Sequence, residues 1–144
     1  MSAVRTVRVA LAGAAAAGVW VAVEPAIRRM TGGRHSQVRL LGGVVAPRGR
    51  WREIGLGMHL VNGAMFGLAF DRLGLRGARR GAVAAEAENA LLWPLVGLVD
   101  RIHPDVRSGA WPPLARSGSE FAQEVLGHAV FGGVMGALIP RRSR

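Results

Sequence analysis

The sequence predicts an all-α integral membrane protein with four transmembrane helices. Three observations lead to this fold class: four apolar blocks of 17 to 19 residues, charges gathered mostly in the gaps between them, and glycines inside the blocks. At a rise of about 1.5 Å per residue, a helix of this length just spans the hydrocarbon core of a bilayer. The predicted helices cover approximately residues 9–27, 54–73, 81–100 and 119–139.

Each block in turn carries few ionisable residues. The first block, 9–27, is free of charge up to residue 23, and the second, 54–70, contains only His59. The third, 81–99, contains two glutamates, and the fourth, 121–139, contains one glutamate and one histidine. A soluble helix needs a polar face along its whole length, but the stretch Leu56 to Phe70 offers only His59 and Asn62. Glycine inside a soluble helix also costs about 1 kcal/mol relative to alanine, whereas membrane helices use it for close packing.

Composition and motifs exclude several classes of protein. The 144 residues suit a single membrane domain, 1–144, and the chain contains no cysteine, so disulfide scaffolds, zinc–cysteine sites and thiol nucleophiles are ruled out. None of the common nucleophile, zinc-protease or phosphate-loop motifs is present, so we expect no enzymatic activity. The net charge of +10 comes from arginines scattered through every gap. This pattern favours contact with anionic lipid headgroups over nucleic-acid binding.

Arginine positions also bear on orientation. The short loop from Arg72 to Arg80 contains four arginines, the C-terminal tail contains three, and Arg5 and Arg8 precede the first block. Under the positive-inside rule these segments are cytoplasmic, although the long first loop, with seven arginines, opposes this assignment. We therefore expect a multi-pass protein of the bacterial inner membrane with both termini in the cytoplasm.

The chain also matches itself at an offset of 69 residues, with a one-residue slip in the loop. The matched positions are Pro25 with Pro94, His35-Ser-Gln-Val-Arg39 with His103-Pro-Asp-Val-Arg107, His59-x-Val61-x-Gly63-x-x-x-Gly67 with His128-x-Val130-x-Gly132-x-x-x-Gly136, and Arg72 with Arg141. Glycine and arginine spacing alone arises by chance, but all four histidines pair as well. We therefore predict two tandem helical hairpins, repeat one at 9–73 and repeat two at 81–141, related as parallel repeats by an axis along the membrane normal.

Several short motifs resemble those of a known family. They are Gly81-Ala-Val-Ala-Ala85, Trp93-Pro-Leu-Val-Gly97-Leu, His103-Pro104, Trp111-Pro-Pro113 and Glu124-Val-Leu-Gly-His128. Together they resemble the YagU-like family of uncharacterised bacterial inner-membrane proteins, which similarly places a histidine where this chain has His59. The resemblance covers roughly residues 58–142 and implies a small multi-helix inner-membrane protein, without implying any chemistry.

Polar residues inside the blocks are the candidate functional residues, because ionisable groups are costly within a membrane. The predicted intramembrane polar core consists of His59, Asn62, Glu86, Glu88, Asn89, Glu124 and His128. Glu124 and His128 are stacked one helical turn apart. His59 has glycine in the equivalent place, so we expect it to find its partner in Glu86 or Glu88. We also expect Gly63, Gly67, Gly132 and Gly136 to bring the second and fourth helices together.

Three interpretations of this core compete. In the first, which we favour, the polar groups hydrogen-bond between helices, and the protein is a non-enzymatic assembly or packing component without a cofactor, as a homo-oligomer or within a larger membrane complex. In the second, a carboxylate–histidine chain handles protons or ions. In the third, His59 and His128 ligate haem or a metal ion.

Overall fold

A computed structural model describes residues 2–139, and every regular element within that range is helical. The prediction of an all-α chain is therefore confirmed for these residues; the last residues of the second predicted repeat and the three C-terminal arginines lie outside them. The elements are α1 (Ala3–Thr31), α2 (Gln37–Val45), α3 (Trp51–Arg72), α4 (Ala78–Leu92), the 3₁₀ turn η1 (Trp93–Leu95), α5 (Val96–Ile102), α6 (Pro104–Arg107), the 3₁₀ turn η2 (Leu114–Arg116) and α7 (Gly118–Leu138).

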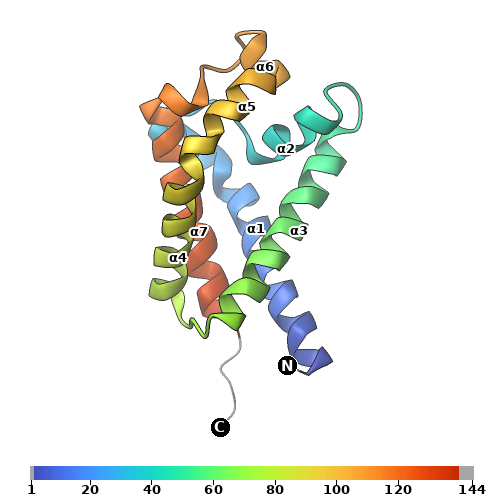
Figure 1. Cartoon of the computed structure of the whole chain (residues 1–144), viewed down its shortest axis with the longest axis vertical. Helices are drawn as coiled ribbons and strands as arrows, with labels where there is room; N and C mark the ends of the chain where they lie inside the picture. The colour runs from blue at the N-terminus through green and yellow to red at the C-terminus, as the bar shows by residue number, and fades with distance from the viewer. Residues whose placement is uncertain (1, 140–144) are drawn as a thin grey trace.

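The long helices form two pairs that meet along α1 and α7 (Figure 1). Helix α1 packs against α3, with α2 beside α3, and helix α4 packs against α7. Helix α1 begins and α7 ends at the lower end of Figure 1, whereas α2, α5 and α6 gather at the upper end. The chain thus runs up and down twice.

The helix bounds depart from the predicted ones for local reasons. Helix α1 begins at residue 3, well before the first apolar block, because the Ser2 side chain caps it by accepting a hydrogen bond from the backbone N–H of Arg5. It ends where Gly32 takes a left-handed conformation, with φ of 76°. The third predicted helix is divided at Pro94 into α4, η1 and α5, because proline cannot donate the backbone hydrogen bond that a continuous helix needs.

Glycines set the closest helix approaches within each pair. A Cβ atom on Gly13 of α1 would fall onto the carbonyl oxygen of Gly63 of α3, and a Cβ on Gly81 of α4 would fall onto the carbonyl oxygen of Gly132 of α7. Gly136 likewise lies against Gly81. We call these contacts the two glycine seams. Our expectation that these glycines join the second helix to the fourth is wrong, because each seam lies within one pair.

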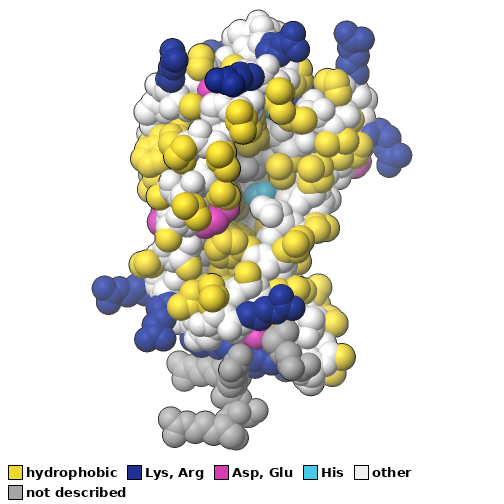
Figure 2. Space-filling model, viewed as in Figure 1, with side chains coloured by type: hydrophobic (Ala, Val, Ile, Leu, Met, Phe, Trp, Pro, Cys, Tyr) yellow, Lys and Arg dark blue, Asp and Glu magenta, His cyan; other side chains and the backbone are white. Residues whose placement is uncertain are grey.

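The distribution of polar and apolar side chains differs from that of a soluble protein, although the core also contains apolar side chains such as Trp20, Phe70, Phe131 and Met135. Large apolar side chains on all four long helices are exposed, among them Leu11, Val61, Met65, Leu91 and Leu138. The buried side chains include the polar or charged residues Glu24, His35, Gln37, His59, Asp71, Asn89, His103, Glu120, Gln123 and Glu124. Figure 2 shows arginines at the two ends of the visible face, with hydrophobic side chains over the band between them.

Two helical segments, Ala3–Thr31 and Ala78–Ile102, have the length and apolar composition needed to cross a membrane. In the second segment only 11% of the most apolar window is buried inside the protein. The core helix of a soluble protein would be mostly buried, so this segment does not have the burial of such a helix.

Candidate functional site

The polar centre of the molecule is His35, in the loop between α1 and α2. It is only 1% exposed. Its Nδ1 lies 2.5 Å from Oε2 of Glu120, and its Nε2 lies 2.7 Å from Oε1 of Glu124. Burial by itself lowers the pKa of His35, but hydrogen bonds and attraction to the two carboxylates outweigh it and raise this pKa to about 9. The imidazole is therefore protonated at neutral pH and donates from both nitrogens.

The N-terminal turns of α7 hold the loop around His35 in place. Glu120, Gln123 and Glu124 lie on one face of α7, since residues three and four apart are neighbours on a helix. Glu120 accepts a hydrogen bond of 2.8 Å from the backbone N–H of Arg34, and the Gln123 amide donates to the carbonyl oxygen of His35 at 3.0 Å. These bonds fasten the end of the first pair to the second.

Gln37 extends the same network toward α1. Its side-chain amide donates to Glu124, and its backbone N–H donates to Oε2 of Glu24 at 3.0 Å. We call the groups His35, Gln37, Glu24, Glu120 and Glu124 the His35 junction. Because it takes residues from α1, the loop, α2 and α7, it connects the two helix pairs.

His128 lies one turn further along α7 and also uses both ring nitrogens. Its Nδ1 lies 2.8 Å from the carbonyl oxygen of Glu124, and its Nε2 lies 3.2 Å from Oε2 of Glu88 on α4. The indole of Trp20 packs edge-on against the His128 ring, with ring centroids 4.7 Å apart. Gly127 makes room for Trp20, since a Cβ there would collide with the indole.

His59 of α3 has a different environment. Its ring also packs against Trp20, at 5.3 Å between centroids. Its Nε2 is buried without a hydrogen-bond partner. The expected pairing with Glu86 or Glu88 is wrong, because the Glu88 carboxylate faces His128.

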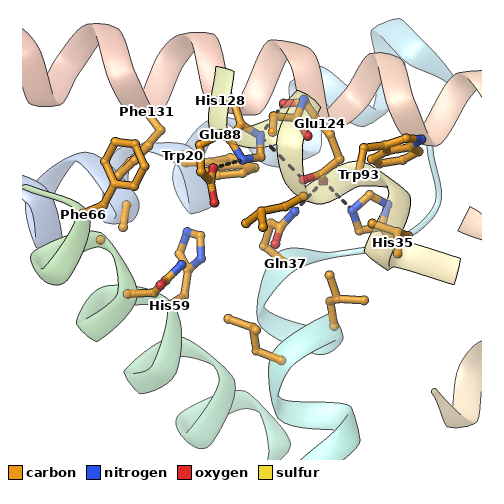
Figure 3. Close-up of a pocket in the computed structure, with 18 of the residues that line it drawn as sticks. Trp20, His35, Gln37, His59, Phe66, Glu88, Trp93, Glu124, His128 and Phe131 are labelled. Carbon is orange, nitrogen blue, oxygen red and sulfur yellow. Dashed lines mark hydrogen bonds and ion pairs between the residues drawn. The ribbon is translucent and has the colours of Figure 1, made fainter. Parts of the chain in front are cut away.

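A cavity of about 190 Å³ lies between the two pairs and collects these groups (Figure 3). Figure 3 shows His59 pointing across it from α3 toward Glu88 and Gln37. A histidine side chain is visible in the corresponding hollow of Figure 2. Residues that line the cavity include Trp20, His35, Gln37, His59, Asn62, Phe66, Glu88, Asn89, Trp93, Glu124, His128 and Phe131.

A second polar cluster lies at the upper end, outside the helix bundle. Arg39 of α2 makes two hydrogen bonds, of 2.6 and 2.7 Å, to the carboxylate of Asp105 on α6, and these hold the pKa of Asp105 below its usual value. His103 stacks on Trp111 at 4.6 Å, and burial lowers the pKa of His103. Trp111 in turn contacts the edge of His35 at 5.9 Å, so this cluster covers the His35 junction.

Six of the seven predicted polar residues line the cavity: His59, Asn62, Glu88, Asn89, Glu124 and His128. Glu86 does not line it, and its Oε1 is buried without a partner. Sequence reasoning missed Trp20, His35, Gln37, Glu120 and Gln123. The match of His35 to His103 in the offset alignment was the available signal, but both histidines fall in loops, where ionisable residues are ordinary.

The geometry does not fit bis-histidine haem ligation. Both nitrogens of His128 already face acceptors, so only His59 has a nitrogen to offer. The cavity is also smaller than the roughly 300–1,000 Å³ of sites for drug-sized ligands. Among residues 2–139, no group of three or more histidine, aspartate or glutamate side chains is arranged to hold a metal ion.

Comparisons with known proteins do not assign a function to this site. No family model, no curated protein and no solved structure matches the chain. The resemblance to the YagU-like family therefore stays a prediction.

Proposed function

We propose that the chain is a four-span protein of the bacterial inner membrane, without enzymatic activity, that serves as an assembly or packing component. The observation that carries this proposal is the distribution of polarity: carboxylates and histidines are buried between helices, while large apolar side chains are exposed on all four long helices. In water such a surface would be an aggregation hazard. In lipid it is the favoured arrangement, because ionisable groups in membrane proteins face the bundle interior.

Arginine spacing supports three of the four spans, among them α3, which is not one of the two helices that meet the length and hydropathy criteria. Arg8 and Arg28 on α1 enclose 19 residues without an arginine, and Arg52 and Arg72 on α3 enclose another 19. Arg80 and Arg101 enclose 20 residues across α4 and α5. At about 1.5 Å per residue, each interval is close to 30 Å, the thickness of the hydrocarbon core.

The His35 junction supports a role in packing. A His–Glu network that joins two helix pairs fixes their register, and the outer apolar faces of the pairs remain open to lipid, to a second copy or to another membrane protein. We assign the lower end of Figure 1, with Arg5, Arg72 and Arg80, to the cytoplasmic side, in contact with anionic headgroups.

We also propose that the two pairs are a tandem repeat. Its support comes from equivalent packing: Gly13 meets Gly63 as Gly81 meets Gly132. Ala17 lies beside Gly63 just as Ala85 lies beside Gly132. These contacts relate α1 to α4 by 68 residues and α3 to α7 by 69, so the one-residue slip falls between the helices of a pair. An offset of 68 places Pro25 opposite Trp93, one residue away from the Pro94 of the sequence match.

The natural absence of cysteine makes the membrane topology directly testable. Single-cysteine variants Arg48→Cys and Ser108→Cys lie in the two upper loops, and Leu73→Cys lies at the lower end. With a membrane-impermeant maleimide, the two upper cysteines should label from the periplasmic side and Leu73→Cys only from inverted vesicles. Release of the full-length chain by a carbonate wash, or labelling of all three cysteines from one side, would defeat the four-span proposal.

Proton handling is the second candidate function, favoured by the continuity of the titratable groups. His35 bonds Glu124, the Glu124 carboxylate lies 3.7 Å from Nδ1 of His128, and His128 pairs with Glu88 at the cavity. If this chain conducts, liposomes containing the protein should acidify under a potassium-diffusion potential, and Glu124→Gln should abolish the flux. Flux equal to that of protein-free liposomes would eliminate this candidate.

A further inference from the structure

The cavity between the helix pairs contains an unsatisfied hydrogen-bond acceptor. His59 lines the cavity and is 5% exposed, and its Nε2 has no hydrogen-bond partner. A neutral imidazole has one donor and one acceptor nitrogen. In the tautomer with the proton on Nδ1, Nε2 is left to accept. An unpaired buried polar atom costs about 1–3 kcal/mol, and an occupant with an N–H or O–H group would relieve that cost.

The charges beside the cavity favour a cation. His35 and His128 each face acceptors with both nitrogens, so both rings are fully hydrogen-bonded only as imidazolium ions. Against these two positive charges stand three carboxylates, Glu88, Glu120 and Glu124. These five groups therefore carry one excess negative charge. Glu86 of α4 also interacts electrostatically with His128 and Glu124, and Glu24 of α1 interacts with His35 and with Arg28 one turn further on.

The rest of the wall favours an organic group over a bare ion. The rings of Trp20, Phe66, Trp93 and Phe131 face the cavity together with several aliphatic side chains (Figure 3). Aromatic faces attract cations, and Trp is the strongest of them. At about 30 Å³ per water molecule, 190 Å³ holds roughly six groups of that size. This volume suits a short alkyl chain with one charged head.

We propose that the cavity binds a small primary ammonium ion with a short apolar tail. Its N–H groups donate to Nε2 of His59 and to the carboxylate of Glu88, and its tail packs against the aromatic rings. The site takes residues from both helix pairs, so the ligand also bridges them. This inference goes beyond the packing role, and it is tested in detergent, where it does not depend on topology.

The test compares four probes on the full-length, detergent-solubilised protein by isothermal titration calorimetry. Butylammonium chloride should bind at least about tenfold more tightly than 1-butanol, which has the same tail without the charge. Butylammonium should also bind more tightly than tetramethylammonium, which has no N–H group to donate, and more tightly than ammonium, which has no apolar tail. Equal binding of butanol, tetramethylammonium or ammonium would overturn the proposal, as would the absence of butylammonium binding.

Variants locate the site. His59→Phe keeps a ring of similar size and removes the acceptor, and Glu88→Gln keeps the shape and removes the charge; each should weaken butylammonium binding by at least about tenfold. Met65→Ala is the matched control, because Met65 is on the same helix and 64% exposed, and it should bind like the parent protein. Unchanged binding in both site variants would overturn the assignment. If His59→Phe fails to fold, the affinity of Glu88→Gln for butylammonium and the comparison of the four probes still test the proposal.

Discussion

The two helix pairs pack in the same way but carry different chemistry. In each, a glycine of the first helix lies against a glycine of the second, Gly13 on Gly63 and Gly81 on Gly132. The polar groups at matched positions differ: His128 has Glu88 and Glu124 beside it, whereas His59 has Trp20 and an unpaired nitrogen. Small residues at fixed spacing are enough to repeat a backbone arrangement, and the side chains between them are free to diverge.

The difference also shows where the pairs depend on each other. The second pair supplies the carboxylates Glu88, Glu120 and Glu124, and the first pair supplies the cation His35 that hydrogen-bonds to two of them. Neither pair could bury its charged groups alone without a large desolvation cost. The junction therefore makes the folding of one pair dependent on the other, whereas each glycine seam belongs to one pair.

The largest expected effect comes from breaking the junction. Glu120→Ala removes the carboxylate that pairs with Nδ1 of His35 and accepts from the backbone of Arg34, leaving buried donors unpaired. Removing one partner of a buried ion pair costs about 3–5 kcal/mol. The thermal unfolding midpoint in detergent should fall strongly, and Glu53→Ala, at an exposed position on α3, should change it little. A small change in Glu120→Ala would mean that the two pairs are held together by other contacts.

Raising the pH should loosen the same junction. The pKa of His35 is raised to about 9 in the folded protein, against an ordinary value of 6.5. The group therefore contributes stability that is fully present below pH 6.5 and is lost as the pH rises toward and through 9. For one proton, the free energy of unfolding changes by at most about 1.4 kcal/mol per pH unit. We expect the unfolding midpoint to fall between pH 6.5 and 9, and to fall less steeply in Glu120→Gln. A midpoint independent of pH over that range would contradict the ion pairing.

Changes at the glycine seams test whether the two pairs are equivalent. In Gly63→Ala and Gly132→Ala the new methyl group meets backbone and a facing alanine, and such overpacking costs about 1–3 kcal/mol. Gly57→Ala and Gly133→Ala are matched controls on the same helices, because nothing lies within 4 Å of an added Cβ. The controls should gain up to about 1 kcal/mol of helix propensity. A large loss at one seam and none at the other would break the equivalence.

The sequence predicted one glycine of each seam contact and six polar residues of the cavity lining, but not the His35 junction. Regular spacing made Gly63 and Gly67 visible, and ionisable residues stand out inside apolar blocks. The partner of each glycine was not predictable, because small residues on one helix fit any other helix. His35 and Glu120 were missed for a different reason. His35 lies in a predicted loop and Glu120 at the start of a predicted helix, where charged residues usually face water, and only the tertiary fold brings residues 85 positions apart into contact.

The smallest expected effect concerns Arg39 and Asp105, which also join the two pairs but lie nearer the surface. Their side chains are 19% and 17% exposed, and the guanidinium also lies 4.9 Å from the centre of the Trp51 ring. Exposed ion pairs are worth about 0–1 kcal/mol, because water and salt screen them. Asp105→Asn should therefore lower the unfolding midpoint slightly at low salt. The difference from the parent protein should shrink in 1 M salt, where the Debye screening length is only about 3 Å.

Glu120→Ala, by contrast, should lower the unfolding midpoint strongly at both salt concentrations, because the His35 junction is shielded from solvent ions. If Asp105→Asn proved as damaging as Glu120→Ala, the upper-end contacts and the buried junction would contribute equally to holding the pairs together, and burial would not be what distinguishes them.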